Sequence, residues 1–477
     1  MLIVLAQIFD RGQEIQSQYP VLGLGYLAAF ARLYLKDLEF VCLDDVEDIV
    51  AAQPDLVGVT VVSENYHLAR EFATELKKAL DVPLVLGGVH VSMLPDTMTA
   101  DFDVGVIGEG EQTFVELLRH IRERGKGWKE GLDAIDGLCF HSNGRLVLTK
   151  QRELIAPLDN IPHPDRELLS SVAGNASERD TYSMFSARGC PYNCNFCSST
   201  NFWRRTRYFS AEYIIEEIRE LKERFGARGI FFWDDLFVVN KQRLYDMERI
   251  LRETGLGEGM SFMCNLRSDV VDEDLCKTLK SMNVYAVSMG LESGSDRVLK
   301  LMNKRTTSAQ HEEALRLLKD FGILVGGSFI IGYPGETRSD MEKTIEFVQK
   351  HLGAALRSFD VYPFILYPGT KSWVEASESG MLDSIAEPYR FKVEEYSLNP
   401  DNYLHANAAA GAHEILMMYL YLKGLSYKNS MNINRDLASD RMKDFLELEQ
   451  HHDALKQHYD VLRLYCEALR QNYEELS

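Results

Sequence analysis

Short apolar runs alternate with amphipathic stretches along residues 1–130 of the chain. Apolar runs at 2–7, 39–44, 55–62, 83–88 and 102–108 predict strands, and helical periodicity at 23–35, 65–80 and 111–124 predicts helices. Such alternation is typical of a parallel sheet with helices on both faces. We therefore expect a doubly wound α/β domain, similar to flavodoxin or Rossmann folds, whose ligand binds at the carboxyl ends of the strands.

The pattern changes over residues 131–180. The segment "GLCFHSNGRLVLTK" predicts a β-hairpin with Asn143-Gly144 at its turn, and "APLDNIPHPDRELL" is rich in proline. We expect a hairpin and linker here, and a domain boundary after them.

Residues 181–370 return to strand–helix alternation. Strands are predicted near 182–187, 229–234, 260–265, 284–291, 325–332 and 358–365. Six such units predict a partial (β/α)6 barrel of the TIM type, with function at the strand carboxyl ends. Residues 371–477 are predicted to be helical, with an amphipathic, acidic end.

Composition narrows the class of protein. The 477 residues are 45% hydrophobic and 26% charged, as in globular proteins with sizeable cores. The formal net charge of −20 disfavours a nucleic-acid partner, which needs basic surface. No signal peptide is apparent, and the apolar stretch 21–35 is interrupted by Arg32 and too short to span a membrane. We expect a cytoplasmic protein with reduced thiols.

Three of the eight cysteines lie together in "RGCPYNCNFC". Cys190, Cys194 and Cys197 are spaced C-x3-C-x2-C. Structural zinc needs four ligands, usually from paired C-x2-C units, and no second such unit follows. Three thiolates on one loop suit an iron–sulfur cluster with one iron left open for a ligand.

This segment resembles the signature of radical S-adenosylmethionine (SAM) enzymes. The resemblance implies that Cys190, Cys194 and Cys197 hold a [4Fe–4S] cluster whose open iron binds SAM, which is cleaved to a 5′-deoxyadenosyl radical. It also implies a set of SAM-binding positions, mostly at strand ends. These are Phe196, Asp234 or Asp235, Arg267, Glu292, Gly327 and Ile331. The family's usual G-G-E is replaced here by "FFWDDLF".

The glycine-rich segments of residues 1–130 resemble the cobalamin-binding domain that precedes many radical SAM barrels. The matching segments are "YPVLGLGYLAAF", "LGGVHVSMLPDTM" and "VGVIGEGEQTFVELL". The positions implied to contact cobalamin are Gly23, Ser63, Gly87, Gly88, His90, Gly108, Glu109, Gly110 and Glu111. From the pattern alone, such a domain could instead bind flavin or a nucleotide, although no G-x-G-x-x-G follows the first strand. The D-x-H-x-x-G motif that supplies a cobalt ligand is absent, so we expect no protein ligand on the lower cobalt face. That absence also leaves open a domain that binds no corrin.

The two resemblances together imply a cobalamin-dependent radical SAM enzyme, with methyl transfer to an unactivated carbon as the leading activity. One SAM would methylate cobalt(I), and a second would supply the radical that activates the substrate. A reducing partner such as flavodoxin or ferredoxin is implied, with a small-molecule, lipid or peptide substrate. Cyclisation, ring contraction and phosphorus methylation remain alternatives. An electron-transfer iron–sulfur carrier is a further alternative from another class.

Overall fold

The computed structural model describes residues 1–9, 21–170, 180–382 and 409–433. The chain divides into two compact units. Unit 1 is Met1–Cys264 with Leu366–Lys392, and unit 2 is Asn265–Ile365 with Val393–Ser477. The predicted domain limits are based on changes in sequence pattern, whereas the two units are defined by contacts between residues. These limits are 1–130, 131–180, 181–370 and 371–477. Those limits stay predictions.

The amino-terminal part of unit 1 is built on a sheet in the order β2-β1-β3-β4-β5-β6-β7. Strands β1 to β5 pair in parallel, and β6 pairs antiparallel with β5. The predicted parallel α/β class is therefore confirmed. The strands are β1 (Leu2–Gln7), β2 (Glu39–Cys42), β3 (Leu56–Thr60), β4 (Leu84–Gly87), β5 (Val104–Val106), β6 (Leu138–Ser142) and β7 (Arg145–Leu148).

Strands β6 and β7 form the predicted hairpin. Asn143 and Gly144 have φ values of 51° and 73°, which suits a two-residue turn between twisted strands. The hairpin extends the amino-terminal sheet, because Gly105 of β5 pairs with the buried Cys139 of β6. The sequence pattern indicated the hairpin without indicating this partner.

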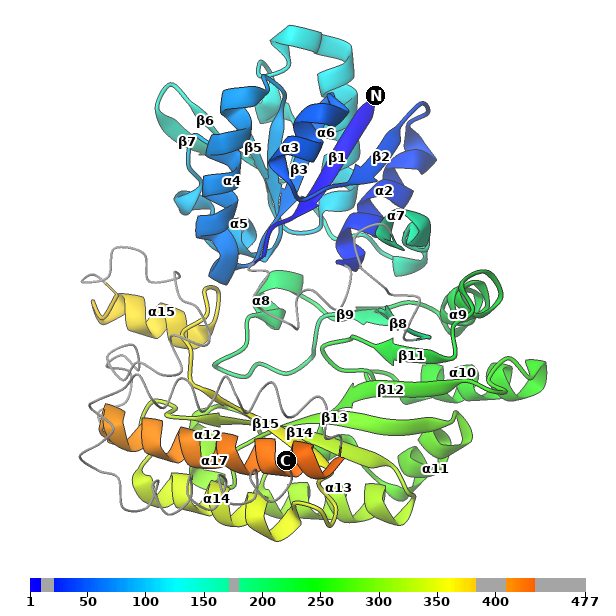
Figure 1. The fold of residues 1–477 in the computed structure, drawn as a ribbon, viewed down its shortest axis with the longest axis vertical. Coiled ribbons are helices and arrows are strands. Elements are labelled where there is room, and N and C mark those ends of the chain that lie inside the picture. The colour runs from blue at the N-terminus through cyan, green and yellow to red at the C-terminus, as the bar shows by residue number, and fades with distance from the viewer. Residues whose placement is uncertain (10–20, 171–179, 383–408, 434–477) are drawn as a thin grey trace, which may run out of the picture. The chain divides into compact units, whose positions relative to one another are not determined.

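Helices cover both faces of the sheet (Figure 1). Helix α2 (Leu22–Tyr34) packs against α6 (Gly110–Arg124), and α3 (Val46–Ala52) packs against α4 (Tyr66–Ala79). The short α5 (Val89–Met93) follows β4. Alternate side chains of β3 and β4 are buried in one core cluster with the apolar face of α4, because successive residues of a strand point to opposite faces of the sheet.

The rest of unit 1 begins the second series of parallel strands. Strand β11 pairs in parallel with both β8 and β12, while β9 pairs antiparallel with β10. Helix α9 begins after Ser210, whose hydroxyl caps Tyr213 N, and ends at Gly226 in the left-handed region. The elements are α7 (Arg166–Ser170), β8 (Thr181–Met184), β9 (Ala187–Arg188), α8 (Ser199–Trp203), β10 (Arg207–Tyr208), α9 (Ala211–Phe225), β11 (Gly229–Phe232), α10 (Lys241–Thr254), β12 (Ser261–Leu266) and α15 (Lys371–Glu378).

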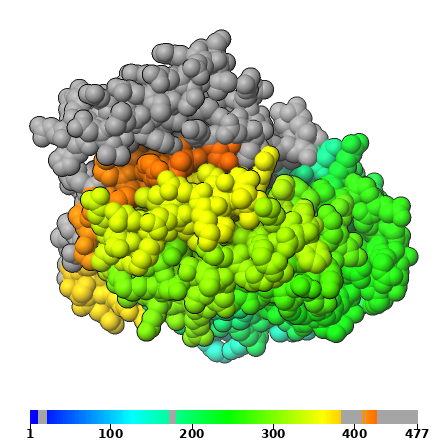
Figure 2. Space-filling view, turned by 90° about the horizontal axis from the view of Figure 1, so that it is seen from below, coloured from blue at the N-terminus to red at the C-terminus, as the bar shows by residue number. Residues whose placement is uncertain are grey.

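Unit 2 continues the series, with β14 paired in parallel to β13 and to β15. The long helix α17 lies along β15 and contacts α14 (Figure 1). Figure 2 shows the outer face of this unit, where atoms of α13 and α14 form the yellow and yellow-green surface. The elements are α11 (Glu273–Ser281), β13 (Val284–Glu292), α12 (Asp296–Leu301), α13 (Ser308–Asp320), β14 (Leu324–Ile331), α14 (Arg338–His351), β15 (Ser358–Pro363) and α17 (Ala412–Ile433).

All six strands predicted between residues 181 and 370 are present. Strand β8 ends at Met184, earlier than predicted, and Ala187 and Arg188 pair with β10 instead. In the predicted helical region, α15 and α17 are helices, and the amphipathic end at 444–476 lies outside the described residues. Among the described helices, none combines the length and apolar character needed to cross a membrane.

Gly88 tests how far glycine is required at the strand ends. Its φ is +100°, and a Cβ there would lie 2.6 Å from Val61 O. We expect Gly88→Ala to destabilise unit 1 by about 1–3 kcal/mol in chemical unfolding. Gly125→Ala is the matched control, because Gly125 also has positive φ but a Cβ there meets nothing within 4 Å. Equal destabilisation by both variants would show that contact with Val61 is unimportant.

Candidate active site

The cysteine loop, residues 189–198, leaves β9 through Gly189. This residue has a φ of +89°, and a Cβ on it would lie 2.9 Å from Trp203 Cβ and 3.1 Å from Arg205 O. The chain therefore needs glycine directly before Cys190 for two reasons, backbone conformation and space.

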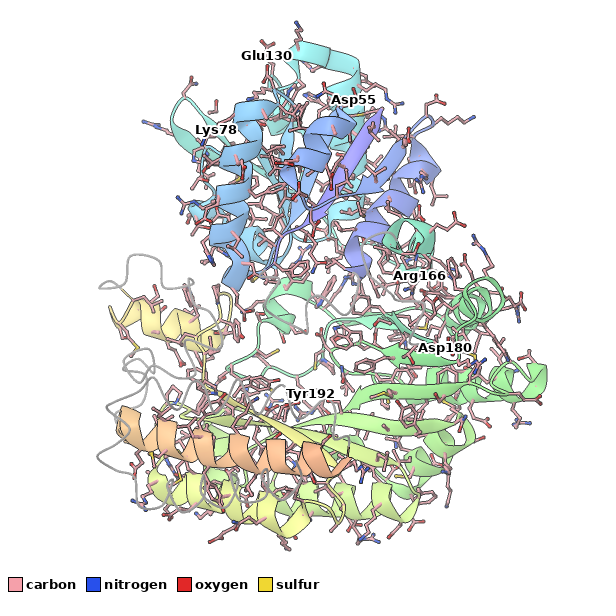
Figure 3. The ribbon with its side chains drawn as sticks, viewed as in Figure 1. Asp55, Lys78, Glu130, Arg166, Asp180 and Tyr192 are labelled. Atoms are coloured by element: carbon pink, nitrogen blue, oxygen red, sulfur yellow. The ribbon has the colours of Figure 1, made fainter. Side chains whose placement is uncertain are left out.

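Hydrogen bonds hold the loop in shape. Cys197 N donates to Cys194 O at 3.1 Å. Thr200 Oγ1 donates to the carbonyl of Tyr192 at 2.8 Å (Figure 3 labels Tyr192). A segment far along the chain also contributes, since Ser372 N in α15 donates to Asn195 O at 3.0 Å. The loop is thus fixed by its own turns and by α15.

The three cysteines differ in exposure: Cys194 is buried, Cys190 is half-buried and Cys197 is exposed. Although the residue as a whole is exposed, the protein around the Cys197 thiol partly desolvates it and raises its pKa to about 11, and the nearby Asp235 and the other two thiols add to the rise. Within the described ranges, no three Cys, His, Asp or Glu side chains converge on a single metal-ion position. Three neighbouring thiols on one loop fit instead a cluster in which each thiolate binds a different iron.

Asp234 lies at the end of β11 and is almost fully buried. Its carboxylate accepts hydrogen bonds from Ser186 N at 2.7 Å, from Ala187 N at 2.9 Å and from the Ser186 hydroxyl. Burial raises the pKa of Asp234 to about 6, although these hydrogen bonds oppose the rise. Asp234 therefore ties β11 to the backbone that leads into the cysteine loop.

Asp235 holds the loop from its other end. Ser199 Oγ donates to its carboxylate at 2.6 Å. Burial raises the pKa of Asp235, and hydrogen bonds from Gly189 and Trp203 oppose the rise. Both aspartates predicted to contact SAM thus have partners in the loop region, and Phe196 lies within the loop itself.

The other predicted SAM-binding residues belong to unit 2. Glu292 ends β13 with a φ of +62°, and Lys304 Nζ donates to its carboxylate at 2.7 Å. Arg267 donates to Asp269 Oδ1 at 3.0 Å and to the carbonyl of Lys304. Lys304 therefore links Arg267 and Glu292 in one buried network, a link that their distance in sequence did not indicate.

Gly327 and Ile331 lie in β14. A Cβ on Gly327 would meet Leu356 at 2.9 Å and Leu291 at 3.0 Å, so the glycine serves close packing there. Ile331 is fully buried. Their predicted contact with adenine stays a prediction.

A cavity of about 470 Å³ lies in unit 1 at the carboxyl ends of the amino-terminal strands. One wall is formed by the predicted residues Gly23, Gly87, Gly88, Gly108, Glu109, Gly110 and Glu111. Another is formed by residues around the cysteine loop, namely Ser183, Phe185, Arg188, Phe202, Trp203 and Trp233. The individual residues of the second wall were not predicted, because they carry no glycine signal and come from the later part of the chain.

The glycine wall fits a bulky ligand. A Cβ at Gly108 would meet nothing within 4 Å, and at Gly23 and Gly87 the nearest atoms would be 3.8 Å away. Side chains at these positions would extend into the cavity. The buried Tyr26 hydroxyl and Ser183 Oγ, both from cavity-lining residues, have no hydrogen-bond partner in the described part of the protein. The cavity therefore offers close backbone approach to a ligand.

Ser63 and His90 do not line this cavity, in contrast to the other predicted cobalamin positions. The His90 ring is fully buried and bonded to Ser63 Oγ at 3.1 Å and Thr97 Oγ1 at 2.9 Å, and it stacks on Tyr66. Burial lowers the pKa of His90 to about 3, so the ring is neutral. Both ring nitrogens serve the core of the domain.

The fold and the cysteine loop define an iron–sulfur enzyme with a second cofactor domain. The radical SAM superfamily model matches residues 184–348, and the B12 binding domain model matches residues 11–118. The chain belongs to the radical SAM superfamily, in the group whose members carry a B12-binding domain. It is a radical SAM enzyme whose cofactors are a [4Fe–4S] cluster, SAM and cobalamin.

Two curated relatives illustrate the group. The chain is 34% identical over 381 residues to an uncharacterized methyltransferase from Pyrococcus horikoshii, covering 76% of this chain and 80% of the relative. It is 28% identical to the anaerobic magnesium-protoporphyrin IX monomethyl ester cyclase of Cereibacter sphaeroides, covering 70% of this chain and 57% of that relative.

Solved structures share the fold. The radical SAM methyltransferase TsrM from Kitasatospora setae, determined with cobalamin and a [4Fe–4S] cluster, matches with a TM-score of 0.66 at 19% identity, covering 79% of this chain and 75% of that one. The cobalamin-dependent enzyme OxsB, with aqua-cobalamin and SAM bound, matches with a TM-score of 0.69 at 17% identity, covering 94% and 71%.

Replacement of Gly189 tests the geometry of the cysteine loop. Gly189→Ala places a Cβ against Trp203 in an unfavourable backbone conformation, so we expect a loss of stability of about 1–3 kcal/mol and less iron bound after anaerobic reconstitution. Gly226→Ala is the control, since Gly226 has a φ of +70° but open space around it. Normal iron content in Gly189→Ala would contradict the loop geometry.

The raised pKa of Asp234 predicts a pH effect. A carboxyl with a pKa of about 6 when folded and 3.8 when unfolded stabilises the protonated folded state, and this contribution is lost as pH rises through 6. Asp234→Asn removes that titration. The wild type should therefore lose about 1 kcal/mol of unfolding free energy between pH 5 and pH 7.5 that the variant does not lose. The free energy of unfolding of the variant minus that of the wild type should rise by this amount. A difference between the two proteins that does not change with pH would refute the assignment.

Proposed function

We propose that this enzyme is a methyltransferase that transfers a methyl group to an unactivated carbon of a small molecule. One observation carries the proposal. The cavity to which we assign the corrin is lined by the strand ends of the amino-terminal domain and also by Arg188, Trp203 and Trp233 around the cysteine loop. Cobalamin in this cavity would therefore contact the segment that holds the radical-generating cluster.

We assign separate roles to the cysteines, the two aspartates and the residues of the cavity. When bound, the cluster supplies the electron that cleaves SAM, and cobalamin supplies the transferable methyl group. Cys190, Cys194 and Cys197 would hold the cluster, while Asp234 and Asp235 position their loop through the hydrogen bonds described above. The glycines of the cavity allow close approach of the corrin, and its aromatic side chains exclude water from the reacting groups.

For SAM itself, the assignments follow the family resemblance. Arg267 would pair with the SAM carboxylate, which suits the guanidinium fork, and Glu292 would accept from the ribose hydroxyls. Phe196, Gly327 and Ile331 would lie against the adenine. The Lys304 contact to both Arg267 and Glu292 supports a shared role for these two residues.

The Pyrococcus horikoshii relative, named a methyltransferase, supports methyl transfer over other outcomes because its match covers most of both chains. The magnesium-protoporphyrin cyclase has lower identity and is matched over 57% of its length. Cyclisation is therefore an outcome for the experiment to distinguish.

Product analysis tests the proposal without knowledge of the substrate. The anaerobically reconstituted enzyme is incubated with SAM, hydroxocobalamin and a strong reductant. Methyl transfer uses two SAM molecules, so we expect S-adenosylhomocysteine from the first and 5′-deoxyadenosine with methionine from the second. 5′-Deoxyadenosine without S-adenosylhomocysteine would support cyclisation or rearrangement, and the methyltransferase proposal would then be wrong.

Two variants separate the cofactors in this assay. Cys194→Ala should abolish 5′-deoxyadenosine, whereas Cys276→Ala, a buried cysteine of unit 2, should not. Gly23→Leu should fill the cavity from α2 and lower bound cobalamin while iron content stays normal. Gly127→Leu is its control, because Gly127 lies outside the cavity in open space. Unchanged cobalamin in Gly23→Leu would place the corrin elsewhere.

A further inference from the structure

We propose that Arg188 is a positioning residue that couples cobalamin binding to the cluster, so that each cofactor raises the enzyme's affinity for the other. The inference rests on the proposed place of cobalamin in the cavity. Arg188 stands two residues before Cys190 and also lines that cavity. It is therefore in contact with one cofactor site and covalently close to the other.

The contacts of Arg188 reach across two parts of unit 1. Its Nη1 donates to Glu109 Oε1 at 2.7 Å, and its Nη2 donates to Glu111 Oε1 at 2.6 Å. Glu109 and Glu111 flank Gly110 at the start of α6, on the glycine wall of the cavity. One guanidinium thus bonds to two carboxylates of the loop predicted to contact cobalamin.

A second arginine completes the cluster. Arg207, in the strand β10 that pairs with Arg188 of β9, donates to both carboxylate oxygens of Glu109 at 2.8 Å. Ile155 N donates to Glu109 at 3.0 Å, and Arg207 also donates to Ile155 O at 2.7 Å. The two positive and two negative side chains are each at most 8% exposed.

Burial makes this arrangement sensitive to small movements. A charge in such surroundings is strongly destabilised when it loses its partner, so the four groups must move together or not at all. Displacement of the loop 108–111 would therefore be transmitted to Arg188, and through the short link to Gly189 and Cys190. The reverse holds for movement of the cysteine loop.

Two aromatic rings extend the connection to the ligand. The Arg188 guanidinium lies 5.4 Å from the ring centroids of both Tyr26 and Trp203, within range for cation–π contact. Both rings line the cavity. A corrin packed against them would fix the guanidinium, and with it the entrance to the cysteine loop.

Coupling of this kind is reciprocal and can be measured as a ratio of affinities. Hydroxocobalamin binding to the full-length chain is titrated before and after reconstitution of the cluster. We expect the wild-type protein to bind it at least about fivefold more tightly when the cluster is present. In the reverse direction, hydroxocobalamin should slow the loss of iron to a chelator and change the electron paramagnetic resonance spectrum of the reduced cluster.

Arg188→Lys is the test variant, because a lysine keeps the charge but lacks the fork that bonds to both Glu109 and Glu111. We expect this variant to retain both cofactors. Its affinity for hydroxocobalamin with the cluster, divided by its affinity without the cluster, should fall to within about twofold of one. Arg166→Lys is the matched control (Figure 3). Arg166 is equally buried and paired with Glu217 at 2.5 Å, but it does not line the cavity, so the ratio should match wild type.

A wild-type affinity ratio of one would overturn the inference, and so would a full ratio in Arg188→Lys. If Arg188→Lys does not fold, Glu111→Gln replaces it, because that variant keeps the Arg188–Glu109 pair; its ratio should also fall, and a wild-type ratio would equally overturn the inference. The proposed function fails differently. If cobalamin binds outside this cavity, the Gly23→Leu variant should bind as much cobalamin as the wild type, whatever the affinity ratio.

Discussion

The buried charge cluster of Glu109, Glu111, Arg188 and Arg207 is the constraint on which the rest of unit 1 depends. Four charges removed from water are stable only while each keeps its partner. Glu109 and Glu111 come from the amino-terminal domain, and the two arginines come from β9 and β10 beside the cysteine loop. Because the cluster fixes these segments together, it also fixes the glycine wall of the cavity relative to the entrance of the loop.

A second set of contacts then sets the shape of the cysteine loop. Asp234 binds the backbone before the loop, and Asp235 binds Ser199 after it. Between them, the left-handed conformation of Gly189 directs the chain past Trp203. The loop thus receives its geometry from hydrogen bonds at both ends. This agrees with the principle that reactive groups are held by rigid surroundings.

Much of the fold could be predicted because apolar runs and helical periodicity are local properties. The strands β1, β4 and β14 and the turn at Asn143-Gly144 were readily visible in the sequence. The partner of the hairpin was not, since the pairing of Gly105 with Cys139 depends on which edge of the sheet is free. Likewise, the C-x3-C-x2-C spacing indicated the cluster loop, because closely spaced ligands need no knowledge of the fold.

The roles of single polar residues were harder to predict for a physical reason. Glu109 and Arg188 are 79 residues apart and Asp234 and Ser186 are 48 apart, so only folding brings the partners together. The sequence around Glu109, a glycine-rich loop, suggested a ligand contact, which stays a prediction. The structure shows that Glu109 forms ion pairs with Arg188 and Arg207. His90 followed a double glycine, yet burial and two hydrogen bonds place it in the core.

The central claim is that cobalamin binds in the unit 1 cavity, against the segment that holds the cluster. A crystal structure of the anaerobically loaded protein tests this most directly. The account predicts corrin density in contact with Gly23, Gly108 and Trp203, with Arg188 still bonded to Glu109 and Glu111. Corrin density outside this cavity, with the cavity itself free of ligand, would contradict it.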